Sequence, residues 1–174
     1  CKKTLQRESG LAVKDVPLIG MITRLASQKG LDLVQEIMND LVSMDVQFIL
    51  LGTGEPVYHE FFKKIAMEYP KKISVTIGFD NALAHKIEAG SDIFLMPSRY
   101  EPCGLNQLYS LKYGTIPLVR KTGGLADTIV NYTPSNLKAG KANGFVFKEY
   151  SSKALLDTIK DAARLYPRNN IWKK

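Results

Sequence analysis

The chain has 174 residues, of which 45% are hydrophobic, and this is enough apolar content to bury the core of one ordinary globular domain. No apolar run is long enough to span a membrane, no signal peptide is evident, and two cysteines are too few for a disulfide framework, so we expect a cytoplasmic protein without a membrane partner. The formal net charge of +7 favours anionic partners such as phosphates, but the basic residues are scattered without a nucleic-acid-binding motif, so we expect no nucleic-acid partner.

Strand and helix patterns alternate along the chain, and the strand patterns are apolar on both faces. In chain order we predict the end of a helix (1–9), then strand 18–23, helix 31–43, strand 47–51, helix 57–69, strand 73–77, helix 81–89, strand 93–96, helix 106–112, strand 116–119, helix 125–131, a surface loop (132–143), strand 145–147, helix 152–165 and the start of a further helix (169–174). Strands that are apolar on both faces are typical of parallel sheets covered by helices. The pattern therefore predicts an α/β fold, a single Rossmann-like, doubly wound parallel sheet.

Two cations follow the first predicted strand. Arg24 and Lys29 lie on the loop that leads into the next helix. Alone, they would be ordinary surface charges. Loops at the carboxyl ends of parallel strands form the ligand crevice of such sheets, however, and a forked arginine beside a lysine suits a diphosphate.

The most informative segment is Ser-Arg-Tyr-Glu-Pro-Cys-Gly-Leu, residues 98–105, between the fourth strand and its helix. Glu101 there could merely stabilise the start of the helix, but a carboxylate in the ligand crevice is the interpretation we favour. The backbone N–H groups of Cys103, Gly104 and Leu105 open a helix and suit an anionic or polar ligand. Because no histidine lies near Cys103 in the sequence, we expect a packing residue and not a nucleophile.

Two further strand ends carry candidate residues. Thr122, Gly123 and Gly124 follow the fifth strand, and the paired glycines would let the backbone approach a ligand closely. Phe79 follows the third strand, where it could belong to the core or offer a flat face to a base.

Together these segments resemble the C-terminal domain of bacterial glycogen synthases and plant starch synthases. The resemblance covers nearly the whole chain and rests on Arg24-Leu25, Gln28-Lys29-Gly30, residues 98–105 and residues 121–125. It implies that residues 1–174 are the nucleotide-sugar-binding, C-terminal half of a glycosyltransferase with two Rossmann-like domains, and that the N-terminal, acceptor-side domain is absent from this chain.

The resemblance also implies an activity: transfer of glucose from ADP-glucose to the non-reducing end of an α-1,4-glucan, with retention of configuration and without a metal or other cofactor. The glucan would dock largely on the other domain, so the chain alone is expected to be inactive. The implied roles are a diphosphate clamp (Arg24, Lys29), a glucose site (Glu101 with the backbone of Cys103, Gly104 and Leu105), the remaining phosphate or sugar contacts (Thr122, Gly123, Gly124) and a stacking face for adenine (Phe79).

Two alternatives stay open. One is another two-domain sugar-nucleotide glycosyltransferase, such as a sucrose- or trehalose-linked enzyme. Many of these carry a second glutamate eight positions after the first, where this chain has Tyr109, as bacterial glycogen synthases commonly do. The other is a non-catalytic module that binds a nucleotide or a glucan.

Overall fold

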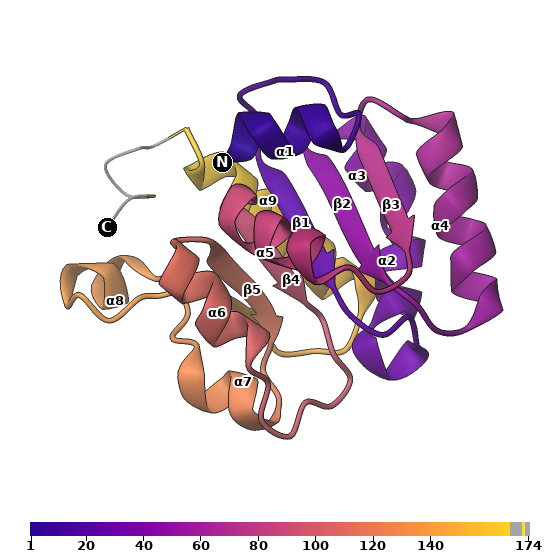
Figure 1. Cartoon of the computed structure of the whole chain (residues 1–174). Coiled ribbons are helices and arrows are strands. Elements are labelled where there is room, and N and C mark those ends of the chain that lie inside the picture. Colours follow the sequence, from indigo (N-terminus) through magenta and orange to yellow (C-terminus); the bar gives the residue numbers. More distant parts are fainter. Residues whose placement is uncertain (168–171, 173–174) are drawn as a thin grey trace.

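A parallel sheet forms the centre of the computed structural model, which describes residues 1–167 and 172 (Figure 1). Within these residues the sheet has six strands in the order β3-β2-β1-β4-β5-β6, and every neighbouring pair is parallel. The strands are β1 (Leu18–Ile22), β2 (Gln47–Gly52), β3 (Ile73–Ile77), β4 (Ile93–Met96), β5 (Ile116–Arg120) and β6 (Phe145–Phe147). The predicted doubly wound parallel sheet is confirmed, with strand ends within one residue of the expected positions.

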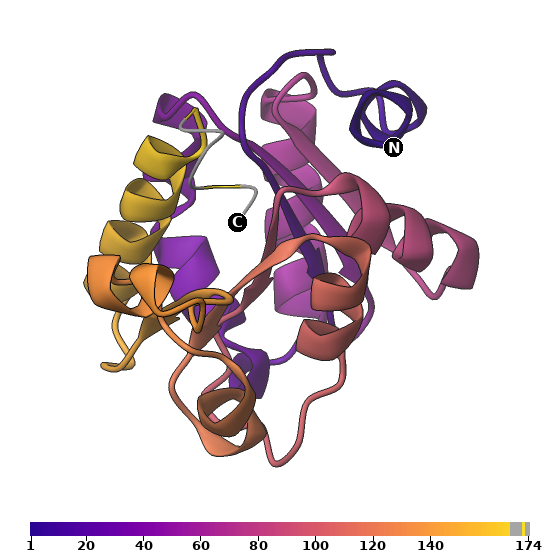
Figure 2. The ribbon, with the colours of Figure 1, turned by 90° about the vertical axis from the view of Figure 1, so that its left-hand side faces the viewer.

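Helices cover both faces of the sheet (Figures 1 and 2). One face carries α1 (Lys2–Glu8), α5 (Asn81–Gly90) and α6 (Asn106–Tyr113), and the other carries α2 (Leu31–Glu36), α3 (Met38–Ser43), α4 (Pro56–Glu68) and α9 (Ser152–Leu165). All six residues of β2 are buried as a result. This two-sided burial is the reason why the strands read as continuous apolar runs.

The predicted helix 31–43 is wrong in one respect, because the chain turns at Ile37 and forms two helices, α2 and α3. The buried residues Leu33, Val34, Ile37, Met38 and Leu41 keep helical spacing through the break. Periodicity therefore carries no signal of the turn.

Two further expectations are corrected near the carboxyl end. The helix predicted for residues 125–131 is α7 (Gly123–Thr128), since Ile129 is already extended and Asn131 bridges to Gly144. The predicted loop 132–143 contains the short helix α8 (Pro134–Lys138), which the Thr133 hydroxyl caps at its amino end. Apart from Trp172, the helix expected at 169–174 falls outside the described residues.

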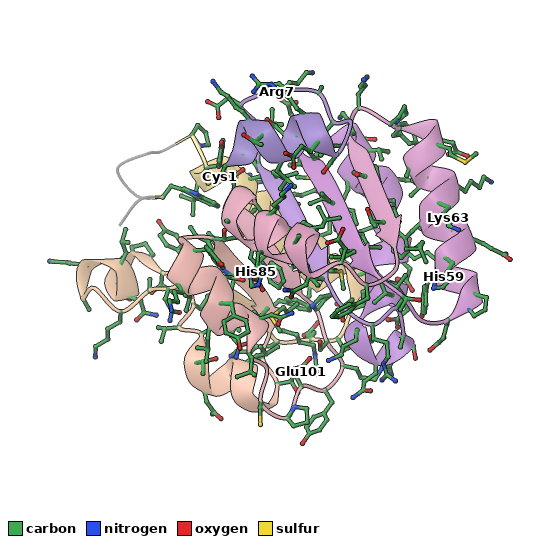
Figure 3. The ribbon with its side chains drawn as sticks, in the orientation of Figure 1. Cys1, Arg7, His59, Lys63, His85 and Glu101 are labelled. Atoms are coloured by element: carbon green, nitrogen blue, oxygen red, sulfur yellow. The ribbon has the colours of Figure 1, made fainter. Side chains whose placement is uncertain are left out.

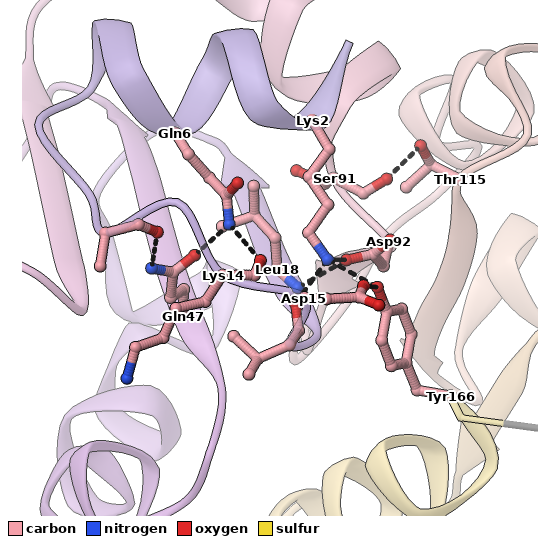
Figure 4. A network of polar contacts seen from close by, with 12 residues as sticks. Lys2, Gln6, Lys14, Asp15, Leu18, Gln47, Ser91, Asp92, Thr115 and Tyr166 are labelled. Atoms are coloured by element: carbon pink, nitrogen blue, oxygen red, sulfur yellow. Dashed lines mark hydrogen bonds and ion pairs between the residues drawn. The ribbon is translucent and has the colours of Figure 1, made fainter.

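A polar network closes the amino-terminal edge of the sheet (Figure 4). Lys2 Nζ lies 2.6 Å from Asp92 Oδ2 and 2.7 Å from the Tyr166 hydroxyl, which donates to Asp15. Asp92 also accepts a hydrogen bond from the Leu18 N–H. Burial raises the pKa of Asp92, and Lys2 opposes that rise. The network ties α1 and the residue after α9 to the sheet.

Candidate nucleotide-sugar site

The strand order brings two distant loops together. β1 pairs with both β2 and β4, so the loops that follow β1 and β4 meet at the carboxyl edge of the sheet. This is the point at which the strand order reverses, where open α/β sheets bind their ligands. Glu101 lies at this edge, to which the strand arrows of Figure 1 point (Figure 3).

A cavity of about 230 Å³ lies between these two loops. Five of the predicted site residues line it, namely Arg24, Lys29, Glu101, Gly104 and Leu105, together with residues at the ends of β1 and β4. The lining residues are Met21, Ile22, Thr23, Arg24, Lys29, Leu95, Met96, Ser98, Glu101, Gly104, Leu105 and Asn106.

Lys29 and Glu101 form an ion pair within this cavity. Lys29 Nζ lies 2.6 Å from Glu101 Oε2, and their side chains are 23% and 12% exposed. The Ser98 hydroxyl donates a second hydrogen bond, of 3.0 Å, to the same carboxylate oxygen. The lysine predicted for phosphate and the glutamate predicted for sugar thus contact each other directly.

Arg24 lines the same cavity but keeps its charge more accessible. Its guanidinium donates to the neutral Gln28 side chain at 3.2 Å, and among the described residues it forms no ion pair. The cavity therefore offers one cation that a carboxylate already holds and one that an incoming anion can approach directly.

The backbone of residues 103–105 is held from below by a buried glutamine. Gln107 in α6 donates hydrogen bonds to the carbonyl oxygens of Cys103 and Gly104. Within the described residues the N–H groups of Cys103, Gly104 and Leu105 donate to no protein acceptor. Since α6 begins at Asn106, Cys103 and Gly104 precede the helix, and binding of a ligand by these N–H groups stays a prediction.

Gly123 and Gly124 have a structural use that the sequence does not reveal. A Cβ added at Gly123 would lie 2.0 Å from the Glu101 carbonyl oxygen, and one at Gly124 would lie 2.0 Å from that of Cys103. The Gly124 N–H also donates to the Glu101 carbonyl oxygen at 3.1 Å. The glycines allow the backbone to approach the loop that carries Glu101, and neither lines the cavity; whether they and Thr122 also contact ligand stays a prediction.

Phe79 and Cys103 lie apart from the cavity. Phe79 is 93% exposed at the carboxyl end of β3, two strands away from β1 in the sheet. It is not part of the core, and its stacking on adenine stays a prediction. Cys103 is exposed as a free thiol and does not line the cavity.

Sequence reasoning missed several polar residues around the cavity. Ser98 and Asn106 line it, and the Asn106 amide donates to the Ile22 carbonyl oxygen. Tyr150, after β6, donates a 2.6 Å hydrogen bond to Asp32, three residues after Lys29. The position of Ser98 within the glutamate segment was the only available signal, since Tyr150 becomes a neighbour only through the fold.

Residues 1–167 and 172 include no group of three or more histidine, cysteine, aspartate or glutamate side chains placed to hold a metal ion. In the same part of the chain, no helix is both long and apolar enough to cross a lipid bilayer.

The domain is a doubly wound α/β fold whose cavity combines cations after β1 with a carboxylate after β4. The chain belongs to the family of glycosyl transferases group 1, which matches residues 2–174. The sheet is that of the C-terminal domain of two-domain glycosyltransferases.

Individual relatives narrow this further. The chain is 56% identical to a glycogen synthase of Thermosipho africanus over 175 residues, covering 99% of this chain and 36% of that protein. It is 55% identical to a glycogen synthase of Desulforudis audaxviator over 165 residues, covering 95% of this chain and 32% of that protein. The matched part is the C-terminal region of those proteins, which confirms the resemblance drawn from the sequence.

A solved structure agrees with these relatives. The catalytic domain of Starch Synthase IV from Arabidopsis thaliana, bound to ADP and acarbose, superposes with a TM-score of 0.91 at 32% identity. That match covers 99% of this chain and 36% of the plant chain. The chain thus spans about a third of the length of the proteins it matches.

Proposed function

We propose that residues 1–174 are the nucleotide-sugar-binding domain of a retaining glucosyltransferase. The whole enzyme would move glucose from ADP-glucose to the non-reducing end of an α-1,4-glucan, as in glycogen or starch synthesis. The observation that carries the proposal is the meeting of Arg24, Lys29 and Glu101 in one cavity at the strand-order reversal. The similarity to glycogen synthases supports the choice of donor and acceptor.

The cationic residues would bind the diphosphate, and the carboxylate would bind the sugar. Arg24 and Lys29 would bind the diphosphate and stabilise the negative charge that develops on ADP as its bond to glucose breaks. Glu101 would accept hydrogen bonds from glucose hydroxyls, and the free N–H groups of residues 103–105 would bind the sugar or phosphate oxygens. No step requires a metal or another cofactor.

The partners follow from the same assignment. ADP-glucose and ADP would bind to this domain, and the α-1,4-glucan would dock mainly on a second, acceptor-side domain. We expect the enzyme to act in the cytoplasm without a membrane or nucleic-acid partner. Phe79 would cover adenine from the end of β3, and Thr122, Gly123 and Gly124 would complete the phosphate or sugar side.

Calorimetric titration of ADP into the chain tests the clamp. Lys29→Ala or Arg24→Ala should weaken binding about ten- to a hundredfold, since a hydrogen bond to a charged group contributes about 1.5–3 kcal/mol. The effect should shrink in high salt. Lys63→Ala, on the outer part of α4 (Figure 3), removes the same charge away from the cavity and serves as the control.

The outcome separates the competing functions. If ADP fails to bind, or if Lys63→Ala weakens binding as much as Lys29→Ala, the clamp is wrong. If UDP-sugars bind more tightly than ADP-glucose, the chain belongs to a different two-domain transferase. If the complete enzyme binds ADP-glucose but transfers no glucose to glycogen, the domain is a binding module.

A further inference from the structure

Tyr150 lies where four strand-end segments converge. It sits between β6 and α9, and its hydroxyl donates a 2.6 Å hydrogen bond to Asp32 Oδ1, in the first turn of α2. The two residues are 118 positions apart in the chain. Since Asp32 follows Lys29 by three residues, this contact anchors the helix that leaves the Lys29 loop.

Two arginines lie over the ring of the same tyrosine. The guanidinium carbon of Arg99 is 4.2 Å from the ring centroid, and that of Arg120 is 5.3 Å away. Arg99 comes two residues before Glu101, and Arg120 ends β5. A ring face attracts guanidinium groups, so one aromatic side chain stabilises two like charges that would otherwise repel each other.

Further bonds make this a closed cluster. Arg99 Nη2 lies 3.2 Å from Asp32 Oδ2, and Arg120 Nη1 donates to the Arg99 carbonyl oxygen at 2.7 Å. The Arg99 N–H donates to the Gln28 carbonyl oxygen at 2.9 Å, which joins the loop after β4 to the loop after β1. One set of contacts thus joins the loop that carries Lys29 to the loop that carries Glu101.

We infer that Tyr150 is a positioning residue, which sets the placement of Glu101 against Lys29 through Arg99 and Asp32 and so determines how well the donor sugar is bound. The inference rests on the proposed function for the identity of the ligand. It does not require Tyr150 to touch the ligand, and Tyr150 does not line the cavity.

The protonation state of the tyrosine fits this role. Burial and the hydrogen bond to Asp32 raise the pKa of Tyr150 to about 12. The hydroxyl therefore remains a donor to Asp32 throughout the physiological pH range. Asp32 can then accept from Tyr150 with one oxygen and from Arg99 with the other.

Two substitutions separate the ring from the hydroxyl. Tyr150→Leu removes both. Tyr150→Phe removes only the hydroxyl and keeps the ring against the two arginines, so it still tests the inference if the leucine variant fails to fold. Tyr69→Leu is the matched control, because Tyr69 is 39% exposed at the end of α4. The measured quantity is the ratio of ADP-glucose to ADP affinity by calorimetry, each variant being compared also in a Glu101→Gln background.

We expect Tyr150→Leu to lower this ratio about tenfold, Tyr150→Phe by less, and the control not at all, since misplacing one contact group affects the sugar more than the nucleotide. In the Glu101→Gln background Tyr150→Leu should have little further effect, because residues that act through one another are not additive. An equal drop in both backgrounds would show a general structural role and overturn the inference.

Amide hydrogen exchange provides a readout that needs no ligand. Tyr150→Leu should speed exchange at the Arg99 amide, which bonds to Gln28, while Tyr69→Leu leaves it unchanged. Unchanged exchange at Arg99 in both Tyr150 variants would overturn the positioning role even if ADP-glucose binds. If the unsubstituted chain binds neither ligand, the proposed function fails, and the exchange result still decides whether Tyr150 holds the loop.

Discussion

Replacing Glu101 by glutamine should make the chain bind ADP more tightly. The Glu101 carboxylate holds Lys29 at 2.6 Å in a pair that is mostly shielded from water. A diphosphate must take Lys29 from this carboxylate and then sit beside its negative charge. Glutamine keeps the shape and a hydrogen-bond acceptor but removes the charge, so both obstacles weaken.

The size of the effect follows from the contact that is given up. A hydrogen bond between charged groups contributes about 1.5–3 kcal/mol net. Lys29 can keep part of its contact with the residue at 101 when ADP is bound, so we expect a gain of about 1–2 kcal/mol, which is about five- to thirtyfold in affinity. ADP-glucose should gain less, because the variant also loses the carboxylate that we assign to the sugar.

The assay is calorimetric titration of ADP and ADP-glucose at low and moderate salt. Glu55→Gln removes a like charge from the exposed loop after β2, at the same edge of the sheet, and controls for long-range electrostatics. Ser98→Ala removes a neutral donor to Glu101 and leaves the ion pair in place. If Glu101→Gln leaves ADP affinity unchanged or lowers it, while Lys29→Ala weakens binding, the ion pair does not compete with the diphosphate and the reasoning is wrong.

Three other predictions concern stability and activity. Lys2→Met should lower the free energy of unfolding by about 2 kcal/mol at pH 7, less than for a fully buried pair, because it leaves Asp92 without its cation. Without Lys2 the raised pKa of Asp92 should rise further, so the loss of stability should shrink as acid protonates Asp92. Chemical denaturation across pH measures this, with Lys3→Met as the control. A loss of stability that does not depend on pH would contradict the prediction. Gly124→Ala should destabilise the chain by about 1–3 kcal/mol and weaken ADP-glucose binding, because the added Cβ would lie 2.0 Å from the Cys103 carbonyl oxygen. An unchanged denaturation midpoint would count against this packing. The chain alone should transfer no glucose from ADP-glucose to glycogen, because a site on one domain neither positions an acceptor nor excludes water. Fusion to the amino-terminal region of the Thermosipho africanus glycogen synthase should restore transfer. Turnover by the chain alone would refute the assignment of donor and acceptor to two domains.

Much of the molecule could be predicted from local sequence. The apolar runs located all six strands within the described residues, because helices on both faces make most strand positions apolar. Gln47 in β2 and Ser74 and Thr76 in the edge strand β3 are exceptions. The same runs placed Arg24, Lys29 and Glu101 at strand ends, since a polar segment after a buried run must leave the sheet at that point. The break at Ile37 was not predictable, because the apolar spacing continues through it.

Only the tertiary structure decided which strand ends are neighbours. β1 lies beside β4, and for this reason Lys29 and Glu101, 72 positions apart, form an ion pair. Tyr150 reaches Asp32 across 118 positions. A sequence pattern records which residues share a helix face or a strand, and long-range pairing depends on strand order, so no local signal could have indicated that one tyrosine links the two loops of the site.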